Sequence, residues 1–278
     1  MNHIFSLAYL TVPGTHPADL VELAASCGYN GVSPRFISMR LPGEPDFSLE
    51  NDEIYRSVRD ALERTELPLM DIELARIADG IDVLSYEKNI ARAAELGVRY
   101  LISSVWTENH AFALRELEKL CDLAAKYHLL VNLEFMSFSG IRTLNEARDL
   151  IQAAGRSNLK LMIDCLHAHR AGVTQAMLEE IPQEELGFIH LCDGPVWIPP
   201  VDHPDMTGVA RSRRLYVGEG EIDIAGLLKG AGEVPYYSIE LPISTETDVR
   251  GKFGHARRCL ETAKAFLNEM DSPGFQSD

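Results

Sequence analysis

Short apolar runs rich in β-branched residues alternate along this chain with longer segments whose apolar residues follow helical spacing. Strands that alternate with helices in this way form parallel sheets joined by crossover helices. The pattern predicts eight strands, which is the number that a closed (β/α)8 TIM barrel needs. With ends uncertain by about 2–4 residues, the predicted strands are residues 3–11, 31–36, 68–75, 100–105, 129–135, 159–164, 187–192 and 236–241.

The segments between these runs carry helix signals. The longest, residues 110–128, places a row of apolar side chains on one face of a helix. This row predicts that Cys121 packs in the core and has no chemical role. The members of the row are Leu114, Leu117, Leu120, Cys121 and Ala124.

Length and composition agree with this architecture. The 278 residues are close to the roughly 250 that are typical of a TIM barrel. We expect a single barrel domain over residues 1–270, followed by a disordered tail at 271–278. No apolar run approaches the ~20 residues of a membrane span, and the first residues lack the basic start of a secretory signal. These features predict a cytoplasmic protein with no membrane partner.

The net charge of −16 opposes binding to nucleic acid, because such binding depends on lysine and arginine neutralising phosphates. Arg211, Arg213 and Arg214 nevertheless form a basic cluster, so a small anionic substrate remains possible. This cluster belongs to a long connection, residues 193–223, and a second long connection covers residues 38–52. Both follow predicted strands and would emerge on the face of a barrel where active sites lie.

Four consecutive predicted strands end in a charged or imidazole residue: Glu134, Asp164, His190 and Glu240. Each could separately be a satisfied core group or a strand-end cap facing solvent. Their equivalent positions on adjacent strands instead predict that they converge, and burying three carboxylates without a cation would cost several kcal/mol each. Three carboxylates and one imidazole suit one divalent metal ion, Mn²⁺, Mg²⁺ or Co²⁺, with Zn²⁺ also possible.

Two motifs and a turn carry a family resemblance. The segment from Asp164 to Gly172, the run His190-Leu-Cys-Asp193 and the turn Gly218-Glu-Gly220 resemble the sugar phosphate isomerase/epimerase family, part of the xylose isomerase-like TIM barrel superfamily. The resemblance covers nearly the whole chain. It implies that Glu134, Asp164, His190 and Glu240 bind a single divalent metal.

The resemblance also implies roles for individual residues. Glu134 and Glu240 would double as the catalytic acid and base, and their division of these roles stays open. His167 would contact substrate oxygens, and Arg214 would reach a substrate oxygen or anion or else be a solvated loop charge. Val217 departs from the family, because related chains commonly have proline there.

Further candidates come from the barrel interior and its loops. Glu73 is expected to face inward, where it could bond a substrate hydroxyl or orient an arginine such as Arg76. Trp106 and Trp197 could wall the pocket, with simple loop packing as the alternative for each.

The favoured function is a metal-dependent isomerase or epimerase in carbohydrate metabolism, acting on a small sugar or polyhydroxy-carbonyl compound through an enediolate. A dehydratase of the inosose or dehydroshikimate type is the main alternative, because it shares the first proton abstraction. An abasic-site endonuclease is disfavoured by the acidic charge and the single quartet, and a non-catalytic metal-binding protein stays open. The resemblance further implies a homo-oligomer, either a dimer or a tetramer.

Overall fold

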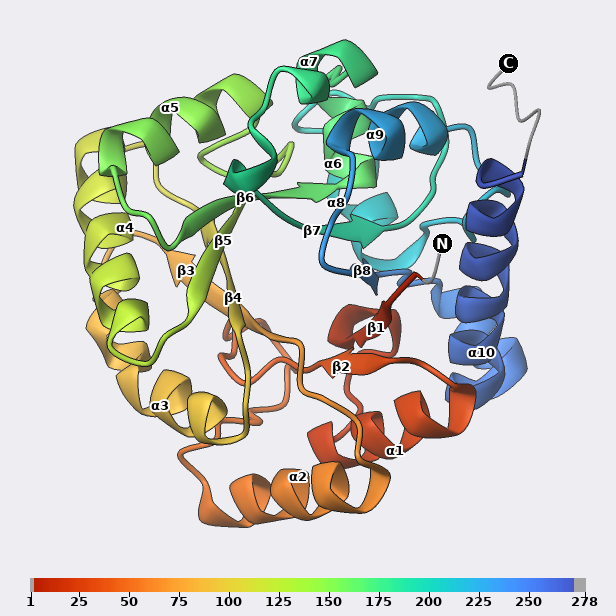
Figure 1. Ribbon diagram of the computed structural model, residues 1–278, viewed down its shortest axis with the longest axis horizontal. Helices are drawn as coiled ribbons and strands as arrows, with labels where there is room; N and C mark the ends of the chain where they lie inside the picture. The colour runs from red at the N-terminus through yellow and green to blue at the C-terminus, as the bar shows by residue number, and fades with distance from the viewer. Residues whose placement is uncertain (1–2, 273–278) are drawn as a thin grey trace.

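A computed structural model describes residues 3–272 of the chain. Eight parallel strands form a nearly closed barrel with helices around it, which confirms the predicted (β/α)8 fold (Figure 1). The hydrogen-bonded order is β2-β1-β8-β7-β6-β5-β4-β3. The strands are β1 (Phe5–Ala8), β2 (Gly31–Ser33), β3 (Asp71–Ile77), β4 (Tyr100–Val105), β5 (Leu130–Glu134), β6 (Leu159–Asp164), β7 (Leu186–Leu191) and β8 (Tyr237–Ile239).

The barrel closes between β2 and β3 through isolated bridges, Val32 to Leu69 and Arg35 to Glu73. The first predicted strand was too long, because the chain turns into a 3-10 helix, η1 (Tyr9–Thr11), after Ala8. The predicted disordered tail at 271–278 lies, beyond Ser272, outside the described residues.

The helices form the outer ring, and their ends follow local capping chemistry. The helix after β5 begins with a capping box. The Thr143 side chain accepts a hydrogen bond from the Glu146 backbone N–H, and the Glu146 carboxylate accepts one from the Thr143 backbone N–H. No helix in residues 3–272 is long and apolar enough to cross a membrane. The helices are α1 (Pro17–Cys27), α2 (Asp52–Thr65), η2 (Val83–Tyr86), α3 (Glu87–Glu95), α4 (His110–Ala125), α5 (Leu144–Ala154), α6 (Cys165–Arg170), α7 (Gln175–Glu179), η3 (Gln183–Glu185), α8 (Pro204–Ser212), α9 (Ile224–Ala231) and α10 (Ser244–Met270).

Most of the core lies between the strands and the helices, and it includes the fully buried Cys121. A smaller apolar cluster fills the barrel interior, where the Phe188 and Tyr236 rings stack at 4.5 Å. Met162 and Phe188 each lie two residues before a charged or imidazole residue of the same strand. Because alternate strand residues share a face, the interior apolar layer positions Asp164 and His190 one layer above it.

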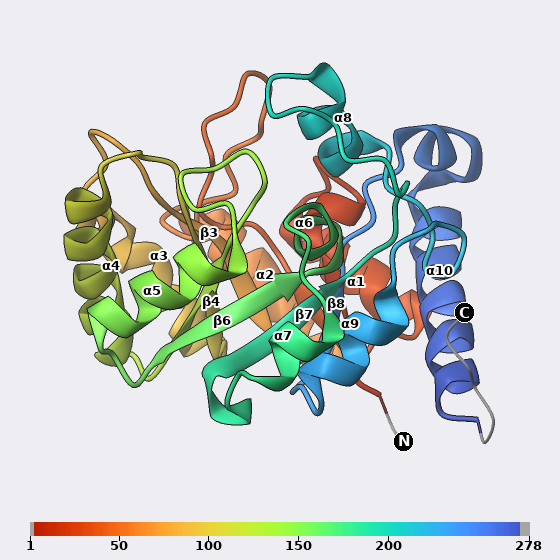
Figure 2. The same ribbon diagram turned by 90° about the horizontal axis from the view of Figure 1, so that it is seen from above.

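Three long connections rise on the same side of the barrel, opposite the N-terminus (Figure 2). They follow β2, β5 and β7, and the last of them contains α8. The sequence predicted the first and third as long connections. It did not predict α8, whose helix begins at Pro204 after His203, with the His203 ring accepting from Asp205 N.

Candidate metal and substrate site

The four residues predicted to converge do so. Glu134 and Asp164 end their strands, His190 lies near the end of β7, and Glu240 directly follows β8. The Nδ1 atom of His190 lies 3.9 Å from Glu134 Oε1, 3.8 Å from Asp164 Oδ2 and 3.6 Å from Glu240 Oε2. One imidazole on β7 therefore faces three carboxylates, from β5, β6 and the residue after β8.

All four side chains are buried, and burial shifts their proton affinities. Burial, followed by the charges of Asp164 and Glu240, raises the pKa of Glu134. Burial lowers the pKa of His190 to about 4, so its ring is neutral near pH 7. Neither ring nitrogen of His190 has a hydrogen-bond partner among the described residues. A neutral imidazole with an unused lone pair beside three carboxylates is a natural ligand for a cation.

Arg214 lies inside this group. Its guanidinium donates to Asp164 Oδ2 at 2.6 Å and to Glu240 Oε2 at 2.7 Å, and it is 2 % exposed. Burial opposes ionisation of Asp164, yet the charge of Arg214 holds the pKa of that carboxyl well below its usual range. Arg214 is thus a structural partner of two acidic residues as well as a candidate for contacting substrate.

The charges of the quartet leave room for a divalent cation. When all three carboxyls are ionised, one guanidinium leaves two negative charges uncompensated in a buried site, and no other arginine or lysine forms an ion pair with them among residues 3–272. Potential ligand atoms of Asp164, His190 and Glu240 lie within 4.8 Å of one another, as do those of Glu134, Asp164 and His167. The residues present therefore fit a divalent metal ion.

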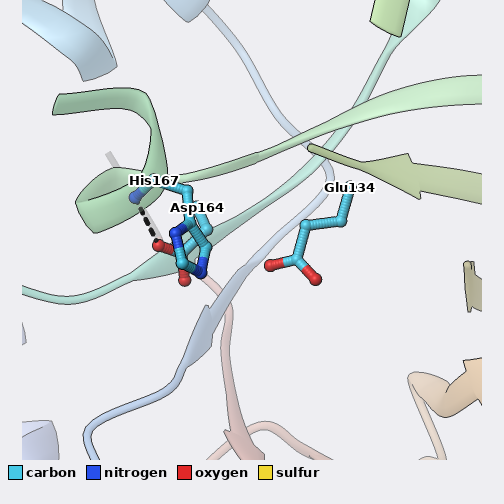
Figure 3. A group of neighbouring side chains, drawn as sticks. All are labelled: Glu134, Asp164 and His167. Atoms are coloured by element: carbon cyan, nitrogen blue, oxygen red, sulfur yellow. Dashed lines mark hydrogen bonds between the residues drawn. The ribbon is translucent and has the colours of Figure 1, made fainter. Parts of the chain in front are cut away.

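His167 stands beside the quartet on α6. Its backbone N–H donates to Asp164 Oδ1 at 3.0 Å, and Nδ1 lies 3.1 Å from Ser137 Oγ. Figure 3 shows the carboxylates of Glu134 and Asp164 on either side of one space, with the His167 ring next to Asp164. Burial lowers the pKa of His167 to about 3, so a neutral ring is available to bond a substrate oxygen.

The Phe138 ring packs edge-on against His167, with 5.3 Å between ring centroids. Both Ser137 and Phe138 belong to the loop after β5, which the sequence did not single out. Trp106 contacts this group through Phe138, at 6.0 Å between ring centroids. Trp197 is 49 % exposed and packs on His203, which favours the loop-packing alternative for this residue.

Glu73 does face the barrel interior, but its arginine partner is Arg35 and not Arg76. Arg35 donates to Glu73 Oε2 at 2.7 Å and contacts Glu44 at 3.3 Å. Arg76 instead donates to the Met39 carbonyl. The alternative pairing failed because Arg76 points away from Glu73 along β3, whereas Arg35 lies opposite it across the β2–β3 closure. Glu73 Oε1 is buried and has no hydrogen-bond partner in the described part of the chain, so it can accept from a substrate hydroxyl.

The end of β8 is held from two sides, which fixes Glu240. Thr11 Oγ1 donates to the Ile239 carbonyl and accepts from Leu241 N, at 2.7 and 2.9 Å. The His255 ring bonds the Leu241 carbonyl at 2.9 Å and the Tyr216 hydroxyl at 2.9 Å. His255 thereby also ties the segment that carries Arg214 to the strand that carries Glu240.

The turn after β7 is organised by one carboxylate. Asp193 accepts backbone N–H bonds from Gly194, Gly218, Gly220 and Ile222, at 2.7 to 3.3 Å. A Cβ added at Gly220 would lie 2.2 Å from Asp193 Oδ1, so this glycine allows the close approach. The family-like turn therefore closes on Asp193 even with Val217 in place of proline.

Replacing Asp193 by asparagine should loosen this turn. An amide can accept at one atom only, and its NH2 would face two N–H donors, so we expect a loss of stability of about 2–4 kcal/mol. Amide hydrogen exchange should rise selectively in residues 193–222. Glu221→Gln, on the same turn, is the control and should leave exchange unchanged. If amide exchange in residues 193–222 of the Asp193→Asn variant equals that of the wild type, the carboxylate does not hold the turn.

Comparison with known proteins identifies a family for the chain as a whole. The family model described as "Xylose isomerase-like TIM barrel" matches residues 21–270. The chain is 24% identical over 241 residues to a 3-dehydroshikimate dehydratase of Pseudomonas aeruginosa. This alignment covers 80% of this chain and 35% of that protein. It is 24% identical over 154 residues to an inosose isomerase of Bacillus velezensis, covering 52% of each. The chain thus spans about a third to a half of the length of these curated relatives.

Solved structures with the same fold include an IolI protein with a bound zinc atom. The two chains superpose with a TM-score of 0.79 at 18% identity, covering 97% of this chain and 100% of the other. A D-psicose 3-epimerase superposes with a TM-score of 0.70 at 12% identity, covering 95% and 99%. At these identities the likeness establishes the fold, whereas the reaction must be argued from the residues.

Proposed function

Because the chain belongs to the xylose isomerase-like TIM barrel family, we propose that it is a metal-dependent isomerase or epimerase of a small sugar or other polyhydroxy-carbonyl compound. The observation that carries the proposal is the imidazole of His190. Neither of its ring nitrogens has a hydrogen-bond partner within residues 3–272, and it lies within 3.9 Å of three carboxylates. Glu134, Asp164, His190 and Glu240 would hold one divalent ion, with Mn²⁺, Mg²⁺, Co²⁺ or Zn²⁺ as candidates. When bound, the ion would polarise a substrate carbonyl and the adjacent hydroxyl, which makes the neighbouring C–H more acidic.

The protein groups around the ion would move the proton. Glu134 accepts no hydrogen bond from Arg214, whereas Glu240 shares Oε2 with that guanidinium at 2.7 Å. The two glutamates therefore differ in basicity, and one can remove the proton that the other returns. Neutral His167 and the free Oε1 of Glu73 would bind substrate oxygens. The Trp106 and Phe138 rings would exclude water from one side.

A dehydratase is the second candidate. Its supporting observation is the alignment with the Pseudomonas aeruginosa 3-dehydroshikimate dehydratase, which extends over 80% of this chain. The same residues would remove the proton, after which a β-hydroxyl would leave with its bonding electrons and a proton, as water. Product analysis separates the candidates, because only the dehydratase changes the molecular formula of the substrate.

Metal analysis of the purified protein tests the quartet directly. We expect about one divalent ion per chain in the wild type, and loss of the ion in Glu134→Ala and His190→Ala, because a missing ligand typically costs a large part of the affinity. Glu118→Ala and His110→Ala, on the outer helix α4, are matched controls that should retain it. The quartet would be refuted by a wild type that takes up no ion from added Mn²⁺, Co²⁺ or Zn²⁺, or by site variants that keep their full content. Exchange of a substrate α-proton with deuterated water would then test the chemistry.

A further inference from the structure

Arg211 is an exposed arginine that has no acidic partner among residues 3–272. Arg211, near the end of α8, places its guanidinium carbon 5.7 Å from the centroid of the Phe138 ring. Its neighbours have partners, since Arg213 pairs with Asp205 and Arg214 pairs with Asp164 and Glu240. Within residues 3–272, Arg211 forms no ion pair, although the chain carries sixteen more acidic than basic side chains. An unpaired cation in such an acidic protein is a position where an anion would be favourable.

Phe138 links Arg211 to the site, because its ring contacts both Arg211 and His167. The same ring that carries Arg211 on its face packs edge-on against His167, whose backbone bonds Asp164. Arg211 is therefore linked to the quartet through two residues, Phe138 and His167, and lies over the loop after β5. The views in Figures 1 and 2 agree that α8 lies above the strand ends and not on the outer wall of the barrel.

A second positive charge, that of Arg35, acts on Arg211. Burial and then the charge of Arg35 lower the pKa of Arg211. Arg35 is itself paired with Glu73 and Glu44. Since both acidic partners are engaged with Arg35, neither is available to Arg211. An anionic group bound beside Arg211 would offset the repulsion between the two guanidinium groups.

We propose that Arg211, supported by Phe138, forms an anion subsite that selects substrates carrying a carboxylate or phosphate group in addition to the polyhydroxy-carbonyl unit. The inference rests on the proposed function, because it assigns the substrate class of that site. The guanidinium would take the anionic oxygens in a two-point contact, while the quartet, His167 and Glu73 bind the oxygens of the carbonyl end. The geometry thus divides the opening into a charged outer end and a metal-binding inner end.

Steady-state kinetics with three substrate types test this subsite. One is neutral, inosose; one carries a carboxylate, 3-dehydroshikimate; and one is a ketose phosphate. For the anionic substrate that the wild type prefers, Arg211→Gln should lower kcat/KM by about 10- to 100-fold, mainly through KM, as loss of a charged hydrogen bond does. Turnover of inosose should change less than about 2-fold, since it has no anionic group to lose. The substrate for which kcat/KM falls in Arg211→Gln identifies the bound anion as a carboxylate or a phosphate.

The control variant is Arg213→Gln, which removes an arginine from the same segment but one that pairs with Asp205. In Arg213→Gln, kcat/KM should be unchanged for all three substrates. A wild type that prefers inosose, or an equal loss on neutral and anionic substrates in Arg211→Gln, would overturn the anion subsite and leave the isomerase or dehydratase proposal standing. Absence of α-proton exchange with every substrate in the metal-loaded protein would instead overturn the proposed function, and the subsite with it.

Discussion

Replacing Arg214 by methionine is expected to make the folded protein dependent on metal and to lower kcat by about 100-fold or more. In the wild type the guanidinium bonds Asp164 and Glu240 at 2.6 and 2.7 Å in a site that is almost fully buried. Removing one partner of a buried ion pair typically costs about 3–5 kcal/mol, because the remaining charge has no compensation. The variant without metal would contain three buried carboxyls, and Asp164 and Glu240 would have lost their arginine ion pairs.

Thermal unfolding with EDTA and with saturating Mn²⁺ measures this dependence. A ligand that binds only the folded state stabilises it, and the gain grows with its affinity. The ion should bind more tightly when Arg214 no longer offsets two of the carboxylates, so the difference between the two Tm values should be larger in Arg214→Met than in the wild type. Arg213→Met, next in the chain but half-exposed, is the matched control and should behave as the wild type. A variant that keeps the wild-type Tm in EDTA would show that Arg214 does not compensate the carboxylates.

Arg214→Lys separates charge from geometry. A lysine keeps one positive charge but cannot bond both carboxylates with a planar fork. Stability in EDTA should therefore recover in part, whereas kcat should stay low if the position of the guanidinium matters for the reaction. Equal recovery of both quantities would indicate that only charge is required.

The convergence of the quartet could be predicted from sequence because it depends on two simple regularities. Parallel strands bring their carboxyl ends to one face of a barrel, and each of the four residues ends a recognisable apolar run. Cys121 was predictable for a similar reason, since one helix face decides its burial. Local patterns of this kind need no knowledge of distant loops.

The partners of these residues could not be predicted in the same way. Arg35 lies in one predicted strand and Arg76 directly follows the next, and only the closure between β2 and β3 shows which of them meets Glu73. Phe138 lies in a loop without periodicity, so nothing in the sequence connects it with His167 or Arg211. Arg214 reaches Asp164 from 50 residues away because the Asp193 turn and α8 direct its segment back over the barrel. Such contacts depend on loop conformation, which the hydrophobic pattern does not encode.

Asp71→Asn is expected to stabilise the protein at alkaline pH and to remove much of the pH dependence of its stability. Asp71 lies on the floor of the site, fully buried, and accepts from Ser33 Oγ at 2.5 Å and from the Tyr236 hydroxyl at 2.8 Å. The other oxygen of Asp71, Oδ1, has no hydrogen-bond partner among the described residues. Burial outweighs these two bonds and, with the nearby Glu73 and Glu240, raises the pKa of Asp71 to about 7 from an ordinary value of 3.8. The folded protein therefore favours the neutral form of this carboxyl.

The sign of the pH effect follows from this shift. Below pH 3.8 the carboxyl is protonated in both states and costs nothing, whereas between pH 3.8 and about 7 the folded state retains a proton that the unfolded state releases. The free energy of unfolding should thus fall as pH rises through this window, by about 3 kcal/mol between pH 4.5 and 8 at about 1.4 kcal/mol per pKa unit. Asparagine stays neutral throughout, so its advantage over aspartate in urea unfolding should grow by about that amount across the same range. Asp60→Asn, on the exposed face of α2, should show no such growth. If the Asp71→Asn difference is the same at both pH values, the carboxyl is not held neutral by its burial.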